Sequence, residues 1–174
     1  IEAPGYELFD HLLKTLPNFH IIAEDLGDLR KEVLILRDHY HFPGMKVIEF
    51  TFDPWHEDHN AQTNMIVYPG THDNQTLRSW YEDQNWRFKL RCRWSLRKYR
   101  HASMLDRLLE YTFCDAADTA IIAMQDILKL DDAARMNTPG TIGSPNWEWK
   151  MIDFSAFEQR IPELRDMLEK GNRL

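Results

Sequence analysis

Ile21-Ile22-Ala23-Glu24-Asp25-Leu26-Gly27 and Val67-Tyr68-Pro69-Gly70-Thr71-His72-Asp73-Asn74 are the two stretches that decide the fold class of this chain. Each is a short apolar run that leads into carboxylates and turn residues. Such runs are typical of buried parallel strands, and in an α/β barrel the residues just past these strands line the active site. We therefore expect Glu24 and Asp73 to face one pocket.

Helices and strands are predicted to alternate around these two stretches. The periodicity of apolar residues and the turn signals between them define the boundaries. The predicted helices cover residues 6–13 and 29–39 and a long region from about 76 to 112, and the predicted strands cover residues 19–23, 45–52, 64–68 and 119–124. The last strand ends in Gln125-Asp126, again a polar pair at a strand end.

A final helix is predicted near the carboxyl end of the sequence. Ser155-Ala156-Phe157-Glu158 has the capping-box pattern, in which the serine and the glutamate satisfy free backbone donors at a helix start. Pro162 lacks a backbone N–H, so we expect a break there. The second segment should carry Leu164, Met167 and Leu168 inward.

Four strands separated by helices or loops, three with acidic residues near their ends, indicate an α/β fold that is half of a (β/α)8 barrel. The chain opens at Ile1 and runs almost directly into the first helix, so we expect it to begin in the middle of a fold. An open half barrel leaves strand edges unpaired. We therefore expect it to need its missing half or a second copy of itself.

Composition narrows the class of protein. The chain has 174 residues, of which 43% are hydrophobic and 28% charged, so it is long enough to bury a core and is not disordered. The net charge of -7 argues against general binding to nucleic acid or membrane surfaces and favours a neutral substrate. Two widely spaced cysteines, Cys92 and Cys114, suit a reducing compartment, and we expect a cytoplasmic location. No apolar run is long enough to cross a bilayer.

Five motifs in order connect the chain to a known family. They are Ala23-Glu24-Asp25-Leu26-Gly27, Pro43-Gly44-Met45-Lys46-Val47, His59-Asn60, Gly70-Thr71-His72-Asp73-Asn74 and Arg135-Met136-Asn137-Thr138-Pro139-Gly140-Thr141. This set resembles the carboxy-terminal part of the 4-alpha-glucanotransferases, also called amylomaltases or disproportionating enzymes. The resemblance runs over essentially the whole chain. It implies the second half of a TIM barrel, with strands 5 to 8 and their helices.

The resemblance also implies a chemistry. Retaining transfer between sugars needs one carboxylate as nucleophile and a second, protonated one as acid. By motif, Glu24 matches the family's general acid/base and Asp73 its third carboxylate, which stabilises the oxocarbenium-like state. The nucleophile of the family lies in an Arg-x-Asp-His type motif that this chain lacks, so the isolated chain is expected to be inactive. The implied substrates are α-1,4-glucans and maltooligosaccharides, with no metal and no cofactor.

The same motifs place further residues at the sugar site. His72 is implied as a ligand of sugar hydroxyls. The other substrate-binding candidates carried by the motifs are Asp25, Asn74, His59, Asn60 and Asn137. Should the chain be active alone, Asp53 and Asp126 are the first candidates for the nucleophile.

Simpler interpretations exist for several of these residues. Glu24 alone is also explained as a helix-start carboxylate, and His72-Asp73 as a turn-stabilising pair. His56-Glu57-Asp58-His59 resembles a metal cluster but lacks the i, i+4 helical spacing that places two histidines on one face. For Trp147 and Trp149 we favour packing of a loop over stacking on sugars.

Two other classes of function remain open at this stage. Residues 86–100 interleave basic and aromatic side chains, as single-stranded nucleic-acid grooves do. An outer barrel helix whose long basic side chains cover apolar surface explains the same pattern, and we favour it. The second alternative is a non-catalytic module that binds α-glucan without turning it over.

Overall fold

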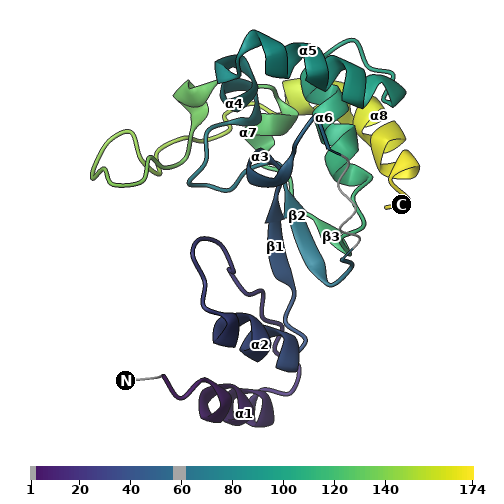
Figure 1. Ribbon diagram of the computed structural model, residues 1–174. Helices are drawn as coiled ribbons and strands as arrows, with labels where there is room; N and C mark the ends of the chain where they lie inside the picture. Colours follow the sequence, from purple (N-terminus) through teal and green to yellow (C-terminus); the bar gives the residue numbers. More distant parts are fainter. Residues whose placement is uncertain (1–2, 57–61) are drawn as a thin grey trace.

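A computed structural model describes residues 3–56 and 62–174 (Figure 1). Its elements, in order, are α1 (Gly5–Thr15), α2 (Lys31–His39), β1 (Gly44–Val47), α3 (Ile48–Thr51), β2 (Met65–Tyr68), α4 (Leu77–Asp83), α5 (Trp86–Ser95), the 3₁₀ helix η1 (Leu96–Lys98), α6 (Met104–Phe113), β3 (Thr119–Ala120), α7 (Met124–Ile127), the 3₁₀ helix η2 (Asp132–Ala134) and α8 (Ser155–Lys170). The predicted helices over 6–13 and 29–39 are confirmed by α1 and α2. The long helical region is present but divided into α4, α5, η1 and α6.

The three described strands form one parallel sheet in the order β1-β2-β3. Gly44 to Val47 of β1 pair with Met65 to Tyr68 of β2, and Ile66 and Val67 pair with the two residues of β3. In Figure 1, α1 and α2 lie near the amino end of β1, whereas the helices α4 to α8 gather beyond the carboxyl ends of the strands. An α/β fold with a parallel sheet is thus confirmed.

The prediction of a strand over residues 19–23 is wrong. This segment is extended but is not a strand of the sheet, and its hydrogen bond to the neighbouring chain runs from the Ala23 N–H to the Pro43 carbonyl at 2.9 Å. A ladder fails to continue because the Met45 N–H donates to the Asp25 carboxylate instead, at 2.7 Å. A side chain has therefore taken the place of a backbone partner on β1.

Two other predicted strands are shorter than expected. The strand over 45–52 ends at Val47 and turns at once into α3, where the Glu49 N–H donates to the Pro69 carbonyl at 3.0 Å. The strand over 119–124 ends at Ala120 and leads into α7. There Asp126 accepts a hydrogen bond from the Leu77 N–H at 2.8 Å, which satisfies a free backbone donor at the start of α4.

The carboxy-terminal helix differs from its prediction in two ways. Ser155 is the first helical residue instead of the cap, and its N–H donates to the Asp153 carboxylate at 3.0 Å, so no capping box forms. The predicted break at Pro162 is also wrong, because α8 runs through it. Pro162 and Glu158 are exposed, so the carbonyl that Pro162 leaves free lies where water reaches it.

The core lies between the sheet and the helices α5, α6 and α8. Ile48, Val67, Leu108, Leu109 and Met167 are almost fully buried there. Leu164 joins Met167 on the buried side of α8, and Leu168 packs against the same cluster, as expected from the sequence. Within the described ranges no helix is long and apolar enough to span a membrane.

Candidate active site

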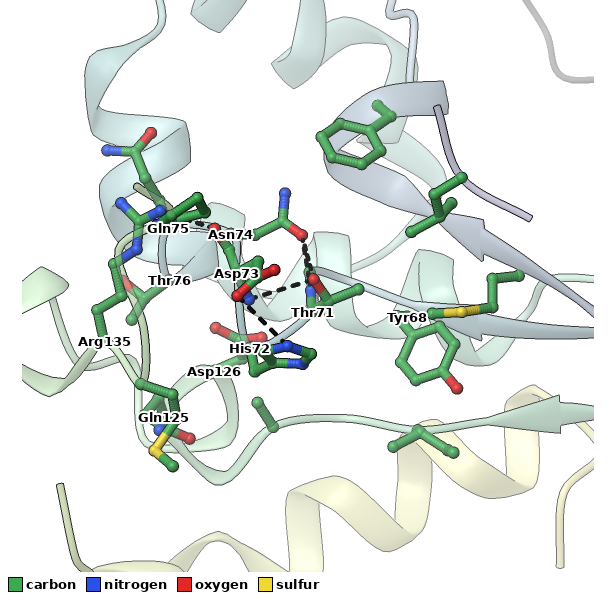
Figure 2. Close-up of a pocket in the computed structure, with 18 of the residues that line it drawn as sticks. Tyr68, Thr71, His72, Asp73, Asn74, Gln75, Thr76, Gln125, Asp126 and Arg135 are labelled. Atoms are coloured by element: carbon green, nitrogen blue, oxygen red, sulfur yellow. Dashed lines mark hydrogen bonds and ion pairs between the residues drawn. The ribbon is translucent and has the colours of Figure 1, made fainter. Parts of the chain in front are cut away.

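A cavity of about 680 Å³ opens where the carboxyl ends of the parallel strands meet the loops that follow them (Figure 2). Its wall includes Glu24 and the turn from Gly70 to Thr76. Side chains from three further segments complete it, namely Tyr68 at the end of β2, Gln125 and Asp126 of α7, and Arg135 after η2. Residues far apart in the sequence thus meet at one edge of the sheet, as expected for parallel strands.

The turn that follows β2 presents His72 and Asp73 to the cavity. The Asn74 Oδ1 accepts hydrogen bonds from the Thr71 N–H at 2.9 Å and from the Thr71 Oγ1 at 2.7 Å. The closed turn leaves both His72 and Asp73 about half exposed, with the His72 Nε2 3.3 Å from the Asp73 Oδ1. Asparagine suits such a turn because its side chain bonds the local backbone.

A second loop holds Asp73 from the other side. The Asn137 Nδ2 donates to the Asp73 Oδ1 at 2.6 Å, and the Arg135 guanidinium donates to the Asp73 backbone carbonyl at 2.7 Å. The Asn137 N–H also donates to the His72 carbonyl at 3.2 Å. These contacts fix the Asp73 carboxylate at the mouth of the cavity, where Figure 2 shows it beside His72.

Trp147 contributes an aromatic surface beside this pair. Its ring centroid lies 5.2 Å from that of His72, and 58% of the residue is exposed. Its backbone has φ 64°, in the left-handed region that bulky residues rarely adopt. The preference for a buried packing role is therefore wrong for Trp147, whereas Trp149 is half-buried as that role requires.

Glu24 approaches the cavity from the extended segment before α2. It is exposed, and it forms no ion pair with any residue that the structure describes. The adjacent Asp25 points elsewhere, because it pairs with Arg37 of α2 and accepts from the Met45 N–H. Asp25 therefore anchors the Glu24 segment to α2 and β1. Gly27, with φ 92°, reverses the chain just beyond Glu24.

Two further carboxyls lie near the exposed ones: Glu49, partly buried, lies against Gly70, and the buried Asp126 lines the cavity. Burial, reinforced by the negative charge of Asp126, raises the pKa of Glu49 to about 8. Burial likewise raises the pKa of Asp126 to about 6, although the hydrogen bond from the Leu77 N–H opposes the shift. Both carboxyls are therefore far easier to protonate than a carboxyl in water.

The structure places the predicted site residues as follows. Glu24, Asp73, His72 and Asn74 line the cavity, and Asn137 bonds to Asp73 beside it. Asp25 is not part of the cavity wall. His59 and Asn60 lie outside the described residues, as does most of the His56–His59 segment.

Sequence reasoning did not single out Glu49 or the contact that Arg135 makes. Arg135 belongs to one of the five family motifs. The motif did not indicate that its guanidinium would donate to the Asp73 carbonyl. Glu49 stood inside a predicted strand, where nothing in the pattern distinguished it from a surface residue. Gln125 and Asp126 were marked as a polar pair at a strand end, and both line the cavity.

The remaining segments singled out in the sequence lie away from the cavity. His56 Nδ1 bonds the Asp53 carboxylate at 2.6 Å, and no cluster of three His, Cys, Asp or Glu side chains suited to a metal occurs within residues 3–56 and 62–174. On α5, Phe88 and Cys92 face the core, whereas the guanidiniums of Arg91 on α5 and Arg97 on η1 lie 4.2 and 4.1 Å from the Trp94 ring centroid. Both arginines therefore cover the exposed ring of Trp94, a neighbour in the same segment.

The cavity combines two exposed carboxylates with a histidine, amides, hydroxyls and an aromatic ring. Carboxylates and amides bind hydroxyl groups, and aromatic faces cover the apolar faces of sugar rings. These groups and the α/β fold are the combination typical of the class of carbohydrate-active enzymes.

Comparison with known proteins narrows this class. A family model described as 4-alpha-glucanotransferase matches residues 1–155. A 4-alpha-glucanotransferase of Streptococcus pneumoniae serotype 4 is 40% identical over 181 residues, covering 99% of this chain and 35% of the relative. The chloroplastic/amyloplastic enzyme of Arabidopsis thaliana is 40% identical over 179 residues, covering 98% of this chain and 31% of the relative.

A solved structure agrees with the sequence matches. The amylomaltase from Streptococcus agalactiae, in complex with acarbose, superposes with a TM-score of 0.88 at 33% identity and covers 99% of this chain and 36% of its own. The chain belongs to the 4-alpha-glucanotransferase family of glycoside hydrolases. It spans about a third of the length of the relatives it matches.

Proposed function

We propose that this chain carries the general acid/base and the third catalytic carboxylate of a 4-alpha-glucanotransferase, which transfers α-1,4-glucan segments between maltooligosaccharides. The observation that carries the proposal is that Glu24 and Asp73, the two carboxylates expected from the family motifs, line one cavity. Glu24, exposed and without an ion pair among the described residues, is placed to give its proton to the leaving oxygen.

Asp73 acts by charge and by hydrogen bonding in this proposal. Its carboxylate is held at Oδ1 by Asn137 and stands beside His72. A fixed negative charge near the anomeric carbon stabilises the positive charge that develops in an oxocarbenium-like state. His72 and Asn137 then offer donors to the sugar hydroxyls around it. Asp25 supports this arrangement indirectly, through Arg37 and β1, by holding the Glu24 segment.

The nucleophile of the double displacement lies outside this chain in the proposal. The chain spans about a third of its relatives, and we propose that its parallel strands are the second half of a (β/α)8 barrel that the remainder completes. The completed enzyme acts on α-1,4-glucans, in keeping with the acarbose complex of its structural relative. A self-paired dimer is the alternative way to cover the open edges.

The test is glucose release from maltotriose by the 174-residue chain, alone and in a chimaera. In the chimaera, residues 1–174 replace the matching third of the Streptococcus pneumoniae enzyme, with which they share 40% identity. Activity in the chimaera but not in the chain supports the proposal. Activity of the chain alone would place a nucleophile within it, with Asp126 the first residue to mutate, because it lines the cavity whereas Asp53 does not.

Titration of the isolated chain with acarbose or maltooligosaccharides tests the alternative that the chain only binds α-glucan. Binding without turnover in either form would indicate an α-glucan-binding module instead of part of an enzyme. Loss of that binding on Asp73→Ala would place the glucan in the same cavity.

A further inference from the structure

Trp147 lies just outside the wall of the cavity and contacts it. Its ring lies beside the His72 ring, with 5.2 Å between the two centroids and an angle of 39° between the planes. His72 lines the cavity, and 58% of Trp147 remains exposed. The indole therefore extends the surface of the cavity beyond His72.

The loop that carries Trp147 projects from the body of the molecule. In Figure 1, residues 136–150 form the yellow-green loop that extends away from the helices. Residues 138–145 are all exposed, and Ile142 is completely so. Trp147 is the position at which this loop returns to the cavity and meets it with a large side chain.

Hydrogen bonds hold the backbone around Trp147. Its N–H donates to the Met136 carbonyl at 2.6 Å, and Met136 lines the cavity. The preceding Asn146 accepts from the Thr138 N–H at 2.9 Å and donates to the Thr141 Oγ1 at 2.8 Å. The position of the indole beside His72 is therefore set by the loop before any ligand arrives.

The backbone conformation of Trp147 is costly for its side chain. Its φ is 64°, a value that glycine adopts freely and that strains a bulky residue. Burial does little to offset this strain, because more than half of the residue is exposed. Stability alone would favour glycine at this position. The ring that stands there instead offers an exposed aromatic face to a ligand.

An α-1,4-glucan has the groups that this surface would bind. Each glucose unit has faces of C–H groups that pack on aromatic rings, and hydroxyls that bond to carboxylates, amides and imidazoles. When His72 and Asp73 hold one unit in the cavity, the adjoining unit of the same chain lies beside them. The Trp147 ring, 5.2 Å from that of His72, is within reach of this second unit.

We infer that Trp147 is a specificity-determining residue, whose indole stacks on the glucose unit next to the one held by His72 and Asp73. The inference rests on the proposed function of the cavity and adds to it a binding surface outside the cavity wall. Such a surface binds the glucan equally before and during transfer. It therefore governs the affinity for the glucan and leaves the rate of the chemical step unchanged.

The first experiment needs no activity. We would follow the indole N–H signals by NMR while maltoheptaose is added to the 174-residue chain and to the chimaera. Trp147→Phe and Trp86→Phe, which lack the indole N–H, identify the two signals. We expect the Trp147 signal to shift and the signal of Trp86, which is 69% exposed on α5, to stay in place. A Trp147 signal that moves in neither protein, or no more than that of Trp86, overturns the inference.

The second experiment distinguishes a binding surface from a support for His72. In the chimaera, Trp147→Ala should raise KM for maltoheptaose about tenfold, because an apolar face loses its cover, and should leave kcat within about twofold. Trp147→Phe keeps an aromatic face and should recover most of the affinity. Trp86→Ala is the matched control and should keep the wild-type KM and kcat. A fall in kcat with KM unchanged would mean that the ring only positions His72, and it would contradict the inference.

A glycine variant tests whether the conformation of the loop matters in place of the ring. Glycine suits the φ of 64° without strain but has no side chain. Trp147→Gly should therefore lose affinity as Trp147→Ala does, and wild-type affinity in the glycine variant would contradict the inference. An inactive wild-type chimaera contradicts the proposed function instead, and the indole titration still decides whether Trp147 binds glucan.

Discussion

Carboxylates occur in two regions of this molecule, and the two regions differ in whether cations pair with them. Between α6 and α8, Asp106 and Glu110 are buried and each contacts cationic or ionisable partners, namely Lys129 and Arg160 for Asp106, and His101 and Lys170 for Glu110. Around the cavity, Glu24, Glu49 and Asp126 form no ion pair with any residue in the described ranges.

This difference in ion pairing distinguishes the packed framework between α6 and α8 from the candidate active site. Cations beside a buried carboxylate offset the cost of burying its charge, and the ion pairs hold together the elements that carry them. A carboxylate without a cation remains free to take or give a proton, or to stabilise a positive charge that develops nearby. The paired carboxylates thus serve folding, and the unpaired ones are available for chemistry.

The comparison predicts the largest effect for a carboxylate of the cavity. Glu24→Gln removes the proton donor of the proposed mechanism, and kcat of the chimaera on maltotriose should fall by about 10²- to 10⁴-fold. The melting temperature should stay the same, because Glu24 is exposed and no described residue pairs with it. Asp28→Asn, a nearby exposed residue, is the control. Activity within threefold of the wild type would contradict the assignment of Glu24.

The framework carboxylate should behave in the opposite way. Asp106→Ala leaves Lys129 and Arg160 without their buried partner, and the free energy of unfolding should drop by about 3–5 kcal/mol. Urea unfolding of the chain measures it. Asp166→Ala, which removes an exposed partner of Lys170 at 2.7 Å, should cost less than about 1 kcal/mol. Equal losses in the two variants would remove the distinction between the regions.

Glu49 should be the carboxyl whose removal stabilises the chain. Its folded-state pKa of about 8 lies above the ordinary value of 4.5, so the unfolded chain ionises first and stability falls as the pH rises from 4.5 to 8. Glu49→Gln abolishes this decline, and at pH 7 it should raise the free energy of unfolding by about 3 kcal/mol. Below pH 4.5 the two chains should be equally stable. A gain that is independent of pH would contradict the linkage.

Much of the fold was predictable, because amphipathic patterns and apolar runs are local. The helices α1 and α2 and the strand β2 were located from such patterns. The failures at residues 19–23 and at Pro162 depend on contacts between distant segments. Residues 19–23 lost their place in the sheet because the Asp25 side chain took the Met45 N–H, and no local pattern contains that contact. The solvent-facing position of Pro162, which lets α8 continue, is likewise set by packing.

The site was predictable to the extent that its residues stand in motifs. Glu24, His72 and Asp73 could be named because each follows an apolar run and stands in a motif of the family. The comparisons confirm the family, and the roles of these residues stay predictions. Their supports could not be named. Glu49 lies beneath Gly70, and Asp25 pairs with Arg37, and both contacts depend on how separate segments meet. A sequence pattern marks a carboxylate but not whether a cation will stand beside it.

The smallest predicted effect tests how firmly the Asp73 carboxylate of the cavity must be held. Asn137→Ala removes the hydrogen bond of 2.6 Å to the Asp73 Oδ1. Because this bond is exposed, its loss should weaken transition-state stabilisation by about 1 kcal/mol, or roughly fivefold in kcat, with little change in KM. The split in kcat and KM follows because Asp73 is proposed to act on the charge of the transition state.

Asn146→Ala is the matched control for that variant. Asn146 belongs to the same loop and accepts from the Thr138 N–H at 2.9 Å, but it does not contact Asp73. If both variants lower kcat equally, the order of the loop matters and the bond to Asp73 does not. If only Asn137→Ala lowers it, a single amide does for Asp73 at the surface what the cations do for Asp106 in the core, which is to hold the carboxylate in place, while leaving its charge free for the substrate.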